Sequence, residues 1–248
     1  MHRAKRAVIL AAGAGKRMHP VTLRIPKPLV TVNGIRMIDT AIRGLWENGI
    51  REIYIVTGYR KEQFMALEKE YPGVCLIENP YYDTCNNISS LYMARECLED
   101  SFILDGDQMI YNAEILRPEF ERSGYHAVWT DSFTNEWLLD VEDGVIAGCS
   151  RTGGKCGWRL VSVSRWNAED GRHLKQHLET EFKKHQNTRI YWDDIPVFCY
   201  PEQYRLGIRV IQPDDMVEID SLEELAELDH HYTRYLKEAK QDEKKRQA

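Results

Sequence analysis

The sequence lacks an excess of positive charge: 33 Lys and Arg residues face 39 Asp and Glu residues, and the formal net charge is -6. Binding to nucleic acid through counterion release needs such an excess, so we expect no nucleic-acid partner. Any phosphate group that the protein binds must therefore meet locally placed cations. The first thirty residues do concentrate basic side chains, at Arg3, Lys5, Arg6, Lys16, Arg17, Arg24 and Lys27.

Cysteine is scarce, with six residues and no Cys-x-x-Cys pair. A disulfide framework is therefore not expected, and reduced thiols in a cytoplasmic protein are the simpler interpretation. No apolar run approaches the roughly 20 residues of a membrane span, so no membrane association is expected. The short apolar run 7–12 is followed by Gly, Lys and Arg without a small-residue cleavage pattern, which argues against a signal peptide.

Hydrophobic periodicity predicts an α/β fold for the first half of the 248 residues. Apolar runs of strand length alternate there with segments of helical spacing, which is typical of a mainly parallel sheet covered on both faces. The expected strands are 7–12, 52–57, 74–77 and 101–104, and the expected helices are 37–46, 61–71 and 89–98.

The pattern changes after Asp107, where turn-linked strands predict a small mixed or antiparallel extension. The expected strands are 127–131, 137–141, 145–150 and 158–164, and the expected helices are 168–185 and 221–239. We expect the polar tail, residues 241–248, either to fray or to link the domain to a further module of a fusion enzyme.

The loop after the first strand contains Gly13 and Gly15, followed by Lys16 and Arg17. At this place in an open α/β sheet, glycines let backbone N–H groups approach a phosphate, and the basic side chains add charge. A dinucleotide fingerprint would need glycine at Met18, and a Walker loop would need Ser or Thr after Lys16. The loop alone could also be a connecting turn.

A second motif, Pro26-Lys27-Pro28-Leu29, holds a lysine between two prolines that restrict its backbone. Together, the two motifs resemble the signature of the nucleotidyltransferases that join a nucleoside triphosphate to a phosphorylated small molecule. The matching segments are Leu10-Ala-Ala-Gly-x-Gly-x-Arg17-Met-x-Pro20, Thr22 and the Pro-Lys-Pro-Leu motif. Most members have Ser or Thr at the position of Lys16, so the role of Lys16 stays open.

The resemblance implies a Rossmann-like, mainly parallel sheet in a single domain, residues 1–240. Residues 1–107 would form its nucleotide-binding part and 108–220 its acceptor-binding part. It further implies that Arg17 contacts the β and γ phosphates and that Lys27 neutralises the α-phosphate, both as catalytic residues. Such chemistry needs positioning and charge more than a covalent nucleophile. The implied nucleotide-binding residues of the loop are Leu10, Ala11, Ala12, Gly13, Gly15, Lys16 and Arg17.

Two acidic segments are candidates for a magnesium site. Asp105 and Asp107 follow an apolar strand, and Glu218 and Asp220 alternate so that they would share one face of a later strand. Mg²⁺ prefers one or two protein carboxylates. The alternatives are that the first pair caps a turn, and that Asp220 or Ser221 caps the last helix. The resemblance implies that Asp107 and Asp220 hold Mg²⁺, with Asp105 near the ribose or behind the metal ligands and Glu218 near water or substrate.

The segment Asn86-Asn87-x-Ser89-Ser90-Leu91-Tyr92 resembles bacterial CTP:phosphocholine cytidylyltransferases. Amide groups suit a pyrimidine edge, which makes Asn87 and Ser89 nucleotide-binding candidates, although Ser89 also suits a helix N-cap.

Two more segments look like the acceptor site of that group, Thr134–Trp137 and Tyr191–Asp193. Aromatic faces with a nearby carboxylate suit a trimethylammonium group, whereas a primary ammonium needs acids and amides. Phosphocholine is thus the first choice of acceptor and 2-aminoethylphosphonate the alternative; aromatics in strands can also be plain core. The candidate acceptor-binding residues are Glu136, Trp137, Tyr191, Trp192, Asp193 and Glu218.

The sequence therefore predicts a Mg²⁺-dependent cytidylyltransferase that acts on CTP and a phosphorylated or phosphonate amino alcohol. A sugar-1-phosphate nucleotidyltransferase and a non-catalytic nucleotide sensor are the rival hypotheses. The sensor would be expected to have lost Lys27 or the metal carboxylates, which are present. The pairs His173/His177 and His230/His231 lack a third metal ligand and offer no competing site.

Overall fold

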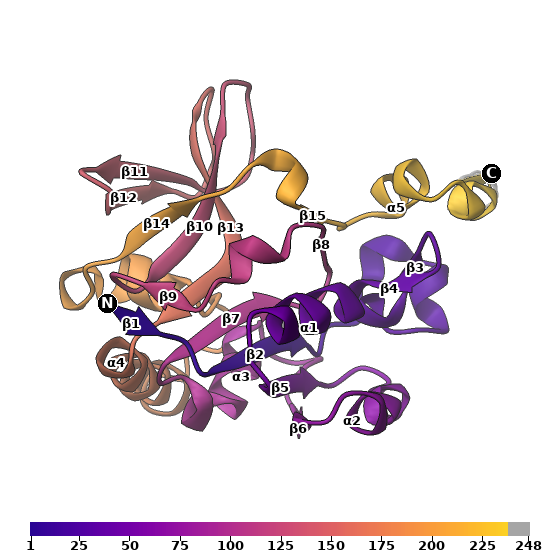
Figure 1. Ribbon diagram of the computed structural model, residues 1–248, viewed down its shortest axis with the longest axis horizontal. Coiled ribbons are helices and arrows are strands. Elements are labelled where there is room, and N and C mark those ends of the chain that lie inside the picture. Colours follow the sequence, from indigo (N-terminus) through magenta and orange to yellow (C-terminus); the bar gives the residue numbers. More distant parts are fainter. Residues whose placement is uncertain (238–248) are drawn as a thin grey trace.

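The computed structural model describes residues 1–237, and the predicted polar tail at 241–248 lies outside them. A mixed nine-stranded sheet forms the centre of the fold, in the order β10-β14-β12-β11-β13-β7-β2-β5-β6 (Figure 1). Its strands are β2 (Arg6–Ala11), β5 (Glu52–Thr57), β6 (Val74–Glu78), β7 (Ser101–Asp105), β10 (Gly124–Thr130), β11 (Leu138–Glu142), β12 (Val145–Ser150), β13 (Gly157–Trp166) and β14 (Gly207–Val210).

The first half of the chain forms the predicted parallel part of the sheet. Strand β2 pairs in parallel with β5 and β7, so that Ile9 lies opposite both Ile55 and Leu104. Successive β2 side chains enter two different cores: Ile9 packs on one face of the sheet and Val8 on the other. This two-sided burial explains why the strand is an uninterrupted apolar run.

Helices cover both faces (Figure 1). The core on the Ile9 side includes side chains of α1 (Met37–Glu47) and residues near α2 (Met65–Glu70), and the core on the Val8 side includes side chains of α3 (Ile88–Met93) and α4 (Ala168–Glu179). A third, smaller core joins α5 (Leu222–Leu228) to the segment that follows β2. The predicted α/β class is confirmed.

The second half adds antiparallel strands through β13, which pairs antiparallel with both β7 and β10. Three short two-stranded sheets were not predicted, because two or three residues are too few for a periodic pattern. They pair β1 (His2–Arg3) with β9 (Glu119–Phe120), β3 (Thr31–Val32) with β4 (Ile35–Arg36), and β8 (Gln108–Ile110) with β15 (Met216–Glu218). The last of these joins the segments that follow Asp107 and precede Asp220.

Several helices are shorter than predicted. The predicted helix 61–71 starts as a 3₁₀ turn, 89–98 ends in one after α3, and 168–185 continues beyond α4 as a π-helical turn. Helix α5 ends at Leu228, inside the predicted helix 221–239; residues 233–237 are helical again, and 238–239 lie outside the described residues. The residue after Leu228, Asp229, is extended, and its carboxylate accepts hydrogen bonds from the backbone N–H groups of Asn33 and His231. Such a bond competes with continuation of the helix.

Among residues 1–237, none of the helices combines the length and the apolar composition that a bilayer crossing requires.

The buried central strand gives a stability prediction. We expect Ile9→Ala to lower the free energy of unfolding by about 2–5 kcal/mol, because it removes fully buried apolar atoms and leaves a cavity. Met65, which is 60% exposed, supplies the control: Met65→Ala should change the free energy by less than about 0.5 kcal/mol. Urea denaturation of both variants measures the difference, and equal effects would contradict the assignment of β2 to the core.

Candidate active site

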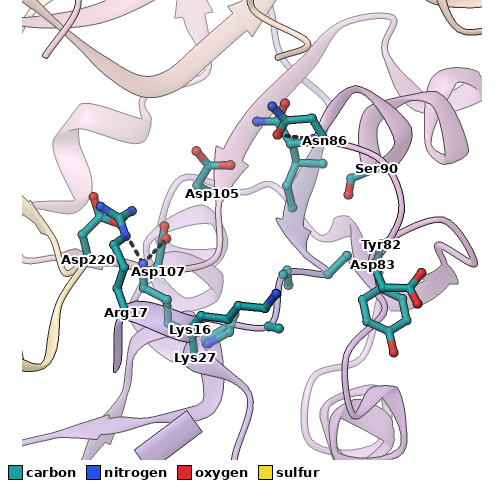
Figure 2. Close-up of a pocket in the computed structure, with 18 residues that line it drawn as sticks. Lys16, Arg17, Lys27, Tyr82, Asp83, Asn86, Ser90, Asp105, Asp107 and Asp220 are labelled. Atoms are coloured by element: carbon teal, nitrogen blue, oxygen red, sulfur yellow. Dashed lines mark hydrogen bonds and ion pairs between the residues drawn. The ribbon is translucent and has the colours of Figure 1, made fainter. Parts of the chain in front are cut away.

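A cavity of about 530 Å³ opens at the carboxyl ends of β2 and β7 (Figure 2). The predicted nucleotide, catalytic and metal residues that line it are Leu10, Ala11, Ala12, Gly13, Gly15, Lys16, Arg17, Lys27, Asn87, Asp105, Asp107 and Asp220. The lining residues that were not predicted as site residues are Ala14, Pro28, Tyr82, Asp83, Asn86 and Ser90. Segments separated by two hundred residues thus meet where an open α/β sheet binds ligands.

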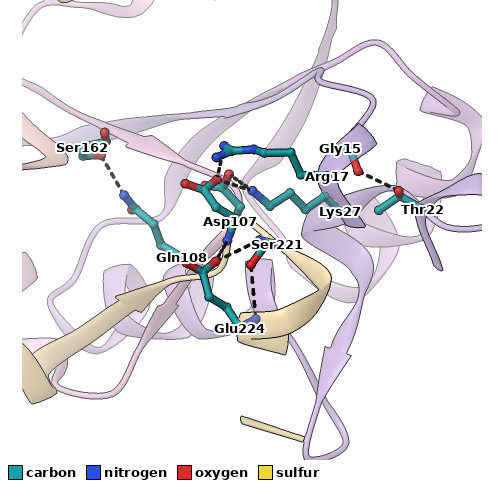
Figure 3. A network of polar contacts seen from close by, with 10 residues as sticks. Gly15, Arg17, Thr22, Lys27, Asp107, Gln108, Ser162, Ser221 and Glu224 are labelled. Atoms are coloured by element: carbon teal, nitrogen blue, oxygen red, sulfur yellow. Dashed lines mark hydrogen bonds and ion pairs between the residues drawn. The ribbon is translucent and has the colours of Figure 1, made fainter. Parts of the chain in front are cut away.

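Glycine is required in the loop because other segments pack closely against it. Gly15 has a φ of +59°, and a Cβ there would lie 3.0 Å from the Cβ of Lys27 and 3.1 Å from Thr22 Cγ2. The Thr22 hydroxyl donates a 2.7 Å hydrogen bond to the Gly15 carbonyl (Figure 3). The glycine loop and the Pro-Lys-Pro motif therefore form one packed unit.

Lys27 connects the two acidic segments. Its Nζ lies 2.6 Å from Asp107 Oδ2 and 2.9 Å from Asp220 Oδ1, and the side chain is 9% exposed (Figures 2 and 3). Burial lowers the pKa of Lys27, but the two carboxylates outweigh it and the net pKa is raised. Arg17 Nη2 adds a 2.6 Å contact to Asp220 Oδ1. The ammonium stays charged and fixes the carboxylates.

The backbone aligns the same carboxylates. The β8–β15 pairing places Gln108 opposite Glu218, and the Ile219 N–H donates to the Asp107 carbonyl at 3.2 Å. Ser221 is the N-cap of α5, and Glu224 accepts hydrogen bonds from the backbone N–H groups of Ser221 and Asp220 (Figure 3). The helix cap thus belongs to Ser221, which leaves the Asp220 carboxylate free to face Lys27. Strand β15 ends at Glu218, so Asp220 lies just beyond it rather than on a shared strand face as predicted.

The donor set fits a magnesium ion. Asp107, Glu218 and Asp220 each offer a carboxylate oxygen, and these oxygens lie within 4.8 Å of one another. Asp107 Oδ1 is buried and has no hydrogen-bond partner among the described residues. Burial, followed by the charges of Asp107 and Asp220, raises the pKa of Glu218 to about 8. Burial and neighbouring carboxylates also raise the pKa of Asp105 well above its ordinary value. Burial is the first cause of both shifts, and a cation bound among these groups would favour their charged forms.

A second cavity of about 280 Å³ adjoins the first and shares Arg17, Asn87, Asp105 and Asp220 with it. Five of the predicted acceptor residues line this second cavity: Glu136, Trp137, Tyr191, Asp193 and Glu218. Leu160 and Ser162 line it as well and were not predicted, since nothing in a strand sequence distinguishes them.

Aromatic and acidic side chains line this second cavity together. The rings of Trp137 and Tyr191 meet edge to face, with centroids 6.0 Å apart. Burial raises the pKa of Asp193 to about 7. An aromatic corner beside carboxylates can bind a small organic cation.

Two sequence-based assignments are wrong. Trp192 is 2% exposed and stacks on Tyr125 with ring centroids 6.0 Å apart, so it belongs to the core and does not line the second cavity. Ser89 is 1% exposed, and its hydroxyl donates to the Asn86 carbonyl. It lies inside α3 rather than at the N-cap, and Ser90 lines the nucleotide cavity in its place.

Variants of Trp192 and of its neighbour Tyr191 distinguish a residue of the core from a residue of the binding site. We expect Trp192→Ala to lower the free energy of unfolding by about 3–5 kcal/mol, as for other buried aromatic residues. The neighbouring Tyr191 is 50% exposed, and Tyr191→Ala should cost less than about 1 kcal/mol while raising the KM for the acceptor. Chemical denaturation with steady-state kinetics tests the pair; a stable Trp192→Ala protein with only a raised KM would overturn the core assignment.

Comparisons with known proteins find enzymes that are similar to this chain over most of its length. The nucleotidyl transferase family model matches residues 6–117. A 2-aminoethylphosphonate cytidylyltransferase from Lancefieldella rimae is 38% identical over 93% of this chain and 94% of its own length. A choline-phosphate cytidylyltransferase from Streptococcus pneumoniae is 33% identical over 90% of this chain and 96% of its own.

The solved structures include that of CTP:phosphocholine cytidylyltransferase from Streptococcus pneumoniae, with a TM-score of 0.86 and 33% identity. The match covers 92% of this chain and 98% of the other. An inositol-1-phosphate CTP transferase from T. maritima, at 18% identity and a TM-score of 0.73, shares the fold. Because the similarity extends over nearly the whole of its relatives, the chain belongs to the nucleotidyltransferase family of enzymes.

Proposed function

We propose that this enzyme transfers CMP from CTP to the phosphate or phosphonate group of a small amino alcohol and releases pyrophosphate. The observation that carries this proposal is the Lys27 centre. It joins a glycine loop to two aspartates, and it lies next to a cavity in which aromatic and acidic side chains meet. The six cysteines are free thiols, which suits the reducing cytoplasm where we place the reaction.

The nucleotide half of the site would bind the triphosphate through the backbone of the glycine loop and through Arg17 and Lys16. Asn87 lines both cavities, and its Oδ1 accepts a hydrogen bond from the Trp192 N–H, which fixes the amide. The remaining amide donors suit the acceptor atoms of a cytosine edge. The buried Trp192 thus supports the site through its backbone.

Asp107 and Asp220, with Glu218 beside them, would hold Mg²⁺. When bound, this ion supplies positive charge and orientation at the reacting phosphate. An acceptor oxygen attacks the α-phosphorus of CTP, a new P–O bond forms, and the bond to pyrophosphate breaks. Lys27 stabilises the charge that develops on the α-phosphate oxygens, for which its ammonium is already desolvated and positioned.

Phosphocholine remains the first choice of acceptor, because Trp137 and Tyr191 form an aromatic corner beside Glu136 and Asp193. One observation favours 2-aminoethylphosphonate as a second candidate. With Trp192 in the core, the cavity has fewer rings than predicted, while its carboxylates offer hydrogen-bond acceptors to a primary ammonium.

An acceptor screen with CTP and Mg²⁺ tests the proposed function. We expect pyrophosphate release with phosphocholine, 2-aminoethylphosphonate or both, and much slower release with hexose 1-phosphates, which bring no cation to the acidic cavity. UTP and GTP should be poor substitutes for CTP. Preferred turnover of a sugar phosphate would contradict the proposal, and exclusive turnover of the phosphonate would replace the first-choice acceptor.

Single variants test the assigned roles. We expect Lys27→Ala and Asp107→Ala each to lower kcat/KM by about 10²–10³-fold, because each removes charge from the reacting phosphate. Arg24 is an exposed cation in the same N-terminal region that lines neither cavity, so Arg24→Ala should retain wild-type kinetics. Steady-state pyrophosphate assays on folded variants give the comparison; wild-type rates for Lys27→Ala would refute the mechanism.

A further inference from the structure

A third cavity, of about 330 Å³, lies at the opposite end of β7 from Asp105, near β9 and the start of β10. Arg165, at the end of β13, pairs with Phe102 of β7, so about 10 Å of strand separates it from Asp105. Arg122, from the turn before β10, and Arg209, from β14, also line the cavity. Three arginines from different segments therefore line one cavity that shares no residue with the nucleotide site.

The fold holds these arginines in place. Arg165 is 4% exposed; its Nη1 donates to the Tyr125 carbonyl, and its buried Nε has no partner among the described residues. Arg209 donates to three backbone carbonyls, those of Ile115, Arg117 and Glu119.

The Arg122 side chain packs directly against the backbone of Gly207. A Cβ at Gly207 would lie 2.6 Å from Arg122 Cδ, so glycine is needed there for this arginine to reach the cavity.

The positive charge is not compensated within the described chain. Among the ion pairs of residues 1–237, none includes Arg122, Arg165 or Arg209. Glu121 and Asp143 line the cavity, but both are exposed residues at its rim. Burial and then the charge of Arg209 lower the pKa of Arg165. Buried charges of this kind are costly unless a counter-charge pairs with them.

We propose that this cavity binds the phosphate group of a small molecule, separately from the nucleotide site. A phosphate dianion presents several oxygens at once, and guanidinium groups match it with paired N–H donors. The fold holds the Arg165 and Arg209 side chains at such a site, and Arg122 adds a third guanidinium from the segment before β10. The inference does not depend on the identity of the acceptor.

Binding of inorganic phosphate tests this site once the nucleotide cavity is disabled. The experiment uses an Arg17→Ala/Lys27→Ala double variant, titrated calorimetrically with phosphate at constant ionic strength, without CTP or divalent metal. We expect phosphate to bind this double variant. Adding Arg122→Ala should weaken the affinity about tenfold, the loss expected for one charge-assisted hydrogen bond. The single variant Arg122→Ala should keep wild-type turnover of CTP.

Two further comparisons define the ligand. Acetate should bind much more weakly than phosphate, and glycerol 2-phosphate serves to distinguish a phosphate ester from the free ion: tighter binding of the ester identifies an organic ligand. Arg165→Lys keeps the positive charge but removes the planar guanidinium with its paired N–H donors. We expect this variant to fold and to bind phosphate several-fold more weakly than the protein with Arg165. Loss of phosphate binding in the double variant, unchanged affinity after Arg122→Ala, or equal binding of acetate would each overturn the proposal.

Discussion

The active site depends on one interaction, the contact of the Lys27 ammonium with Asp107 and Asp220. The three residues come from the first loop region, the end of the parallel sheet and a segment near residue 220, and among residues 1–237 no other side chain forms ion pairs with both aspartates. Because Lys27 is largely buried, its charge would be costly without these partners. These ion pairs offset the cost of burying the Lys27 charge. They also bring the glycine loop and the two acidic segments into one site.

Three carboxylates, those of Asp107, Glu218 and Asp220, lie around two cations, Lys27 and Arg17. Glu218 joins the two aspartates; burial raises its pKa, and the charges of Asp107 and Asp220 raise it further. Such a site is suited to receive a divalent ion and a triphosphate together, since the ion is drawn to the carboxylates and the phosphates to Lys27 and Arg17. The negative net charge of the whole chain is therefore compatible with phosphate chemistry, because the cations that matter are local.

The sequence predicts the parts of this structure that long patterns or glycine motifs encode. The strand-helix alternation and the loop from Leu10 to Arg17 indicate the sheet and its phosphate side. The short pairing of β8 with β15 has no such pattern, yet it aligns Asp107 with Asp220. Trp192 and Ser89 match the expected motifs, but tertiary packing buries both. Residue type thus identifies candidates, whereas only the packing decides which of two neighbouring residues, such as Tyr191 and Trp192, faces the cavity.

Binding of Mn²⁺ to Lys27→Met, measured by electron paramagnetic resonance without nucleotide, tests most directly whether Lys27 balances these carboxylates. Methionine removes the ammonium but keeps much of the side-chain volume. The account predicts tighter Mn²⁺ binding than in the wild-type protein, since the ammonium no longer competes for Asp107 and Asp220, and loss of that binding when Asp107→Asn is added. Unchanged or weaker Mn²⁺ binding by Lys27→Met would contradict it.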